Sequence, residues 1–258
     1  MDASDAAPAM PLPAPQPLAF RIQRALGRLL APLWLPLVVL LMRVGCGWTI
    51  AGVDDVRREF RRLRAESEAP LLLCANHLTM IDSALIAWAL AAPWWYVAHY
   101  AALPWNLPER ANFAQSWWQR LLVPLMKCLP ITRGGARSDV AAVLGQFTAL
   151  LAHGEAGLIF PEGGRSRTGR VDRSAATYGV GRVVRSLPDC RVLCVYLRGE
   201  HQAGWSRLPA RGERFRVSLA CITPQTTAPG LRGSLAVAEQ VLACLADLER
   251  RHFEDLAA

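Results

Sequence analysis

Short apolar runs that alternate with helix-like segments are the feature of this sequence that most limits its fold. The runs have the length of buried strands, and the segments between them have the composition or spacing of helices that pack on a sheet. The expected strands are residues 71–75, 94–98, 157–160, 192–197 and 215–221, and the expected helices are residues 83–91, 138–154, 177–186 and 234–253. Such alternation predicts an α/β fold, with a mixed, mostly parallel sheet flanked by helices.

The N-terminal region is expected to form two parts ahead of this domain. Residues 1–20 are rich in Ala and Pro and lack periodicity, so we expect a disordered tail there. This tail does not read as a secretory signal, because no basic start leads directly into an apolar stretch. Residues 21–55 hold an uncharged apolar run between arginines and predict a helical segment that associates with a membrane. Residues 56–258 then form the α/β domain.

The apolar run, residues 29–42, is short for a helix that crosses a membrane. Its 14 residues would extend about 21 Å as an α-helix, against about 30 Å of hydrocarbon. We therefore expect the segment to enter or lie along one leaflet. Extension past Arg43 through residue 53 would let it span, and a buried core helix is the third alternative.

The charge balance favours anionic partners. The chain of 258 residues has 29 Lys plus Arg against 21 Asp plus Glu, a net charge of +8. Phosphate groups, acidic lipid headgroups or an acidic carrier protein would suit this charge. Nucleic acid is not expected, because zinc-finger and recognition-helix patterns are absent and the basic residues are spread along the chain. The seven cysteines are odd in number and lack metal-ligand spacing, which indicates reduced thiols in a cytosolic setting and no metal site.

A polar segment, residues 76–82, follows the first expected strand and could carry chemistry. Loops at the carboxyl ends of strands build the sites of such sheets. Within this segment, His77 is a natural base for an alcohol near neutral pH, and Asp82 could fix its tautomer from the other ring nitrogen. In the alternative interpretation, Asp82 only caps the following helix and His77 has a structural role.

A second segment, residues 160–166, reads Phe-Pro-Glu-Gly-Gly-Arg-Ser after another expected strand. Gly163 and Gly164 would let backbone amides approach an anion, and the Arg165 guanidinium could bind a phosphate with two hydrogen bonds. Glu162 could orient Arg165 or bind a substrate hydroxyl. The alternative is a solvated basic turn. Walker and dinucleotide glycine patterns are absent, so nucleoside triphosphates and NAD are not expected.

Taken in order, these segments resemble the glycerolipid acyltransferase family, which includes 1-acylglycerol-3-phosphate acyltransferases. The matches to its three motifs are His77 and Asp82 with Asn76 before them, Ile131 and Arg133, and residues 160–166. Order and spacing agree over roughly residues 70–200. Position 164 is Gly where the family most often has Thr, and residues 192–195 lack the proline of a later motif. These departures affect the identity of the acceptor more than the reaction.

The resemblance implies a role for each matched residue. His77 would be the general base and Asp82 its orienting partner. The expected substrate-binding residues are Asn76, Arg133, Glu162, Gly163, Gly164, Arg165 and Ser166. The implied reaction moves a fatty acyl group from acyl-CoA or acyl-carrier protein to the hydroxyl of a lysophospholipid such as 1-acylglycerol-3-phosphate.

The resemblance also sets expectations for partners and place. The thioester would be a co-substrate, no cofactor is expected, and the enzyme would work at the cytoplasmic face of the inner or cell membrane. Two alternatives stay open. One is the same chemistry on a lyso-ornithine or other specialised lipid acceptor, and the other is a catalytically silent lipid-binding homologue.

Overall fold

The computed structural model describes residues 18–257, apart from residues 114–115, 118–122, 124 and 133. Its strands are β1 (Thr49–Ile50), β2 (Leu71–Ala75), β3 (Trp105–Asn106), β4 (Gly157–Ile159), β5 (Arg191–Gly199) and β6 (Arg214–Ile222). Its helices are α1 (Leu18–Leu40), η1 (Leu41–Gly45), α2 (Val53–Ala65), α3 (Asp82–Leu90), α4 (Pro93–Ala98), η2 (Tyr100–Ala102), α5 (Arg110–Phe113), α7 (Arg137–Ala152), η3 (Arg173–Ala175), α8 (Tyr178–Arg185) and α9 (Gly230–Ala257).

A single six-stranded sheet organises the molecule, with strand order β1-β6-β5-β2-β4-β3. The neighbours run parallel except for β5 and β6, which pair antiparallel along their whole length. The expected α/β fold with a mixed, mostly parallel sheet is therefore confirmed.

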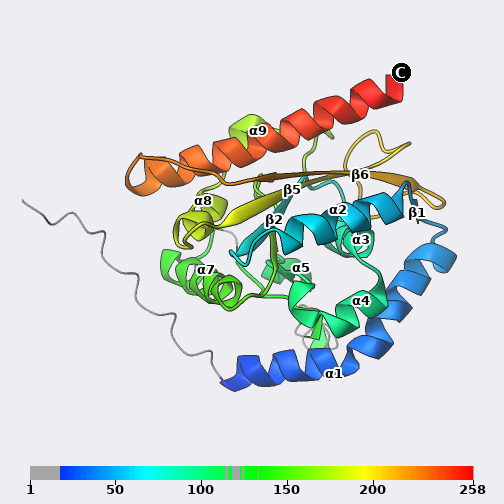
Figure 1. The fold of residues 1–258 in the computed structure, drawn as a ribbon, viewed down its shortest axis with the longest axis horizontal. Coiled ribbons are helices and arrows are strands. Elements are labelled where there is room, and N and C mark those ends of the chain that lie inside the picture. The colour runs from blue at the N-terminus through cyan, green and yellow to red at the C-terminus, as the bar shows by residue number, and fades with distance from the viewer. Residues whose placement is uncertain (1–17, 114–115, 118–122, 124, 133, 258) are drawn as a thin grey trace, which may run out of the picture.

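Both faces of the sheet are covered, which explains why the strand sequences are apolar without alternation. Leu72 and Cys74 of β2 pack into a cluster formed with α7, α8 and α9. Leu71 and Leu73 of the same strand point to the other face and pack with α2 and α3. Figure 1 shows α9 above the sheet and α2 and α3 below it.

The strand predicted at residues 94–98 is wrong, because this segment forms helix α4 (Pro93–Ala98). Pro93 stands at the first helical position, where its missing N–H costs nothing and its fixed φ suits a helix. Tyr96 is then buried against Ala31 and Leu35 of α1. Packing in three dimensions overrides the strand preference of the aromatic and β-branched residues in this segment.

The N-terminal helix is longer than the apolar run alone. Residues 1–17 of the expected tail lie outside the described residues, and α1 begins at Leu18 and includes Pro32 and Pro36. With η1 it makes a 26-residue apolar helix, Phe20–Gly45, the one helix in the described part of the chain long and apolar enough to cross a membrane. Figure 1 shows this segment curving around the lower side of the molecule, beside α4.

One face of this N-terminal helix is apolar and exposed. Its members recur every three or four residues and are 46–72% exposed: Leu18, Ile22, Leu26, Leu29, Leu33, Leu37, Leu40 and Val44. We call this row the α1 stripe. The opposite face packs on the body through Ala31 and Leu35, so the segment is not a buried core helix. An apolar row of this length facing outward points to association with a membrane.

Candidate active site

The loop between β2 and α3 brings His77 and Asp82 into direct contact. The Nδ1 atom of His77 lies 2.9 Å from the Oδ2 atom of Asp82, and both side chains are largely buried. The same Oδ2 accepts the backbone amides of Leu78, at 2.6 Å, and Thr79, at 2.8 Å. The Thr79 hydroxyl donates to Oδ1. These hydrogen bonds tie the carboxylate to the loop before it and hold it against the imidazole.

Aromatic stacking also fixes the face of the imidazole ring. The ring of His77 stacks on that of Phe160, with centroids 3.9 Å apart and planes 13° from parallel. The backbone carbonyl of His77 accepts the amide of Ser166 at 2.9 Å. Because Asp82 engages Nδ1, Nε2 is the nitrogen left for a substrate.

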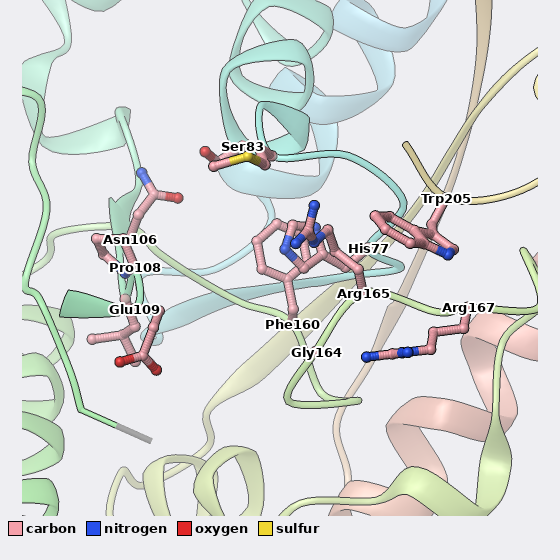
Figure 2. A pocket seen from close by; sticks show the side chains of 12 residues that line it. His77, Ser83, Asn106, Pro108, Glu109, Phe160, Gly164, Arg165, Arg167 and Trp205 are labelled. Atoms are coloured by element: carbon pink, nitrogen blue, oxygen red, sulfur yellow. The ribbon is translucent and has the colours of Figure 1, made fainter. Parts of the chain in front are cut away.

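This histidine lies at the wall of a cavity of about 320 Å³. Figure 2 shows His77 and Arg165 near its centre, with Asn106, Pro108 and Glu109 on one side and Arg167 and Trp205 on the other. The walls come from the loops after β2, β4 and β5 and from the segment that begins with β3. The site therefore lies at the carboxyl ends of the parallel strands, as such sheets favour.

One wall of the cavity is basic and has an unused donor. The guanidinium carbon of Arg165 lies 5.2 Å from the ring centre of Trp205, and Arg167 lines the same wall. The Nη1 atom of Arg165 is buried and has no hydrogen-bond partner among the described residues. A buried guanidinium nitrogen without a partner is suited to an anion entering the cavity.

Glu162 lies beside the cavity rather than in its wall. Its Oε1 accepts the amide of Asp172 at 2.8 Å, while Oε2 has no partner in the described part of the chain. Among the described residues it forms no hydrogen bond with Arg165, whose guanidinium packs on Trp205 instead. Burial raises the pKa of Glu162 to about 7, although the backbone amides of Asp172 and His77 partly offset this.

Two other expected site residues shape the backbone. The Asn76 side chain donates to the carbonyl of Leu197 at 3.0 Å and accepts its amide at 2.8 Å, so it ties the end of β2 to β5 outside the cavity. Gly163 has a φ of +67°, and an added Cβ would lie 2.7 Å from a methyl carbon of Thr177. A glycine is therefore required at this position by both conformation and space.

Of the remaining residues expected to bind substrate, only one lines the cavity in the described part of the chain. Gly164 lines the cavity. The Ser166 hydroxyl donates to the carbonyl of Arg170 at 2.5 Å, so it closes its own turn. Arg133 lies outside the described residues.

The structure adds cavity residues that the motifs do not contain. Ser83 follows Asp82 on the first turn of α3, and Asn106 comes from the two-residue strand β3. The Oδ1 atom of Asn106 is buried without a hydrogen-bond partner in the described residues. Ser83 could have been inferred from its place next to the His-Asp loop. No sequence signal marks Asn106 or Trp205, because neither belongs to a recognisable pattern.

A second, apolar groove adjoins this cavity and shares Ser83 and Asn106 with it. It lies between α1, α3 and α4, and its walls include Leu35, Val38, Ala87, Trp88 and Tyr96. Because two side chains belong to both spaces, a molecule with a polar reacting end and an apolar tail could occupy both at once.

Within the described residues, no group of three or more His, Cys, Asp or Glu side chains is placed to hold a metal ion.

A comparison with protein families supports the site. A search of curated proteins finds no match. The family model described as Acyltransferase matches residues 52–198, more than half of the chain, and this span contains both the His77–Asp82 loop and residues 160–166. The chain belongs to the glycerolipid acyltransferase family.

Proposed function

We propose that this acyltransferase moves a fatty acyl group from an acyl thioester to the hydroxyl of a lysophospholipid such as 1-acylglycerol-3-phosphate. The observation that carries the proposal is the His77–Asp82 contact of 2.9 Å at the wall of a cavity lined by Arg165 and Arg167. A base and an anion-binding wall in one cavity suit an acceptor that has a hydroxyl near a phosphate.

In the proposed reaction, Nε2 of His77 accepts the proton of the acceptor hydroxyl as the oxygen attacks the thioester carbonyl. Asp82 stabilises the imidazolium that forms. A C–O bond forms, the C–S bond breaks, and the proton passes from the imidazolium to the leaving thiolate. The reaction needs no covalent acyl-enzyme, because holding both substrates in one cavity supplies the positioning.

The acceptor is proposed from the charge of the wall. A phosphate would accept a hydrogen bond from Nη1 of Arg165, which has no partner among the described residues, whereas a phosphate-free acceptor such as a lyso-ornithine lipid would leave this donor unused. A catalytically silent lipid-binding homologue would not need the oriented His77–Asp82 pair.

The donor is proposed as acyl-CoA or acyl-carrier protein, which present the same thioester. Its acyl tail would lie in the groove between α1, α3 and α4, which opens beside the reacting atoms at Ser83. The thioester is a co-substrate, and the mechanism calls on no cofactor.

The place of action is proposed as the cytoplasmic face of the membrane. One face of α1 packs on the body and the other exposes the α1 stripe, so we propose that the helix lies in one leaflet rather than crossing both. Lysophospholipid acceptors would then reach the cavity from that leaflet.

The proposal is tested by His77→Ala. We expect transfer to lysophosphatidate to fall by at least about a hundredfold, because the base is lost. His153→Ala is the matched control: the ring of this exposed histidine bonds the carbonyl of Ala149 in the helix just before it. Both variants should remain folded. Near wild-type turnover in folded His77→Ala would end the assignment.

A further inference from the structure

The basic wall of the cavity depends on two loops that lie far apart in the sequence. Residues 161–172 carry Arg165 and Arg167, and residues 200–208 carry Trp205. The position of the wall relative to the base therefore depends on what holds these loops.

Each loop is tied to the catalytic loop by the backbone. The amide of Ser166 donates to the carbonyl of His77 at 2.9 Å, and that of Ser206 donates to the carbonyl of Leu78 at 3.0 Å. A shift in either loop would thus move the backbone at His77 or at the next residue, Leu78.

A buried arginine joins the two loops to each other. Arg198, 5% exposed at the end of β5, donates from Nη1 to the carbonyl of Gly169 and from Nη2 to that of Ala203 at 3.0 Å. The two backbones touch here: a Cβ added at Gly169 would lie 2.7 Å from the Ala203 oxygen.

The C-terminal helix supplies a carboxylate that binds the first of these loops, residues 161–172. Both oxygens of Glu249, on α9, accept the amide of Val171, at 3.3 and 3.2 Å. The Tyr196 hydroxyl donates to Glu249 at 3.2 Å and lies 3.5 Å from the Nη1 atom of Arg198. The guanidinium and the carboxylate thus bind the same loop directly, at Gly169 and Val171, and the Tyr196 hydroxyl bridges them.

We propose that Arg198 and Glu249 are positioning residues that set the anion-binding wall for the acceptor headgroup. Neither side chain lines the cavity, so they act through the loops that carry Arg165 and Trp205. This inference rests on the proposed function, since it names the acceptor as the substrate that the wall holds.

The test compares Arg198→Lys with Arg191→Lys. Arg191 begins the same strand and also binds with two prongs, to the carbonyl of Leu63 at 2.7 Å and to the carboxylate of Glu66 at 2.8 Å, but at the end of the sheet away from the cavity. In each case an ammonium cannot reproduce the two-pronged geometry of a guanidinium. Both variants therefore lose a two-pronged contact, and only Arg198→Lys loses the link between the loops.

In Arg198→Lys we expect the KM for lysophosphatidate to rise about tenfold, with the KM for the acyl thioester and kcat changed less than about threefold. Glu249→Gln, which keeps one carbonyl oxygen for Val171, should show a smaller rise in the same constant. Arg191→Lys should change none of the three. An unchanged acceptor KM in folded Arg198→Lys, or an equal rise in Arg191→Lys, would overturn the inference.

A second readout does not depend on activity. Amide hydrogen exchange should accelerate at residues 161–172 and 200–208 in Arg198→Lys and not in Arg191→Lys. If wild-type protein transfers no acyl group but this exchange pattern appears, the proposed function fails while the loop link stands. Unchanged exchange in both loops refutes the link itself.

Discussion

At the scale of single residues, the site separates two carboxylates by their surroundings. The carboxylate of Asp82 accepts two backbone amides and a hydroxyl beside His77. That of Glu162 accepts the amide of Asp172, and burial raises its pKa to about 7. One carboxylate is thus surrounded by donors, whereas the other is held where protonation and charge compete near neutral pH.

We predict that Glu162→Gln removes a pH dependence of stability. In the folded protein the pKa of Glu162 is about 7, above the ordinary value of 4.5, so the folded state holds this proton more tightly than the unfolded state. Its contribution is therefore full below pH 4.5 and lost as the pH rises to about 7. Because the carboxyl is partly solvated, we expect a loss of about 1–2 kcal/mol.

The measurement is denaturant unfolding of both proteins across this pH range. The difference in unfolding free energy between wild type and Glu162→Gln should shift in favour of Gln on going toward neutral pH. A difference that stays constant would show that Glu162 titrates normally in the folded protein.

At the scale of elements, α1 presents the feature most open to test. We predict that Leu33→Gln combined with Leu37→Gln weakens binding to vesicles of anionic phospholipid by about tenfold or more, because two exposed apolar side chains of the α1 stripe become polar. The control is Leu231→Gln, which is 55% exposed on α9, on the opposite side of the molecule in Figure 1.

Co-sedimentation with vesicles measures the effect. Equal retention of the double variant and the control would show that the α1 stripe does not contact lipid. Deleting residues 1–53 is a blunter test, since it also removes β1 and the buried Trp48 of the core.

The apolar groove gives a prediction about chain length. Ala87 of α3 lines it between α1 and α4, and a leucine there would fill part of the space. For Ala87→Leu we expect the ratio of kcat/KM for long over short acyl thioesters to fall about tenfold. Ala141→Leu, on the exposed surface of α7, should leave the ratio unchanged. A parallel loss for all chain lengths would place the acyl tail elsewhere.

At the scale of the whole molecule, the sequence predicted the four central strands β2, β4, β5 and β6 but neither edge strand, because β1 and β3 are only two residues long. Residues 71–75 are apolar at every position, and this pattern holds because helices cover both faces of β2. Residues 94–98 have a similar composition but form a helix, because contact with α1 decides their conformation. Pro32 and Pro36 disfavour a continuous helix, yet α1 includes both while its inner face packs on α4.

The site likewise contains residues that the sequence predicts and residues that only the structure reveals. His77, Asp82 and Arg165 lie in short motifs, and the fold brings His77 and Arg165 to one cavity with Asp82 bonded to His77. Asn106 and Trp205 reach that cavity from segments without a motif, so only the tertiary structure reveals them. The motif residues Asn76 and Ser166 bond backbone atoms instead, which a pattern match cannot distinguish from contact with substrate.

Burial of the single lysine side chain has a chemical consequence for the protein. Lys127 is the only lysine of the sequence, and it is 1% exposed, with its amine bonded to the carbonyls of Tyr100 and Leu103 and to Glu155. Activated esters and thioesters modify free amines spontaneously. A protein that handles such compounds would thus keep its single ε-amino group sequestered, and its native state would resist self-acylation of lysine during turnover.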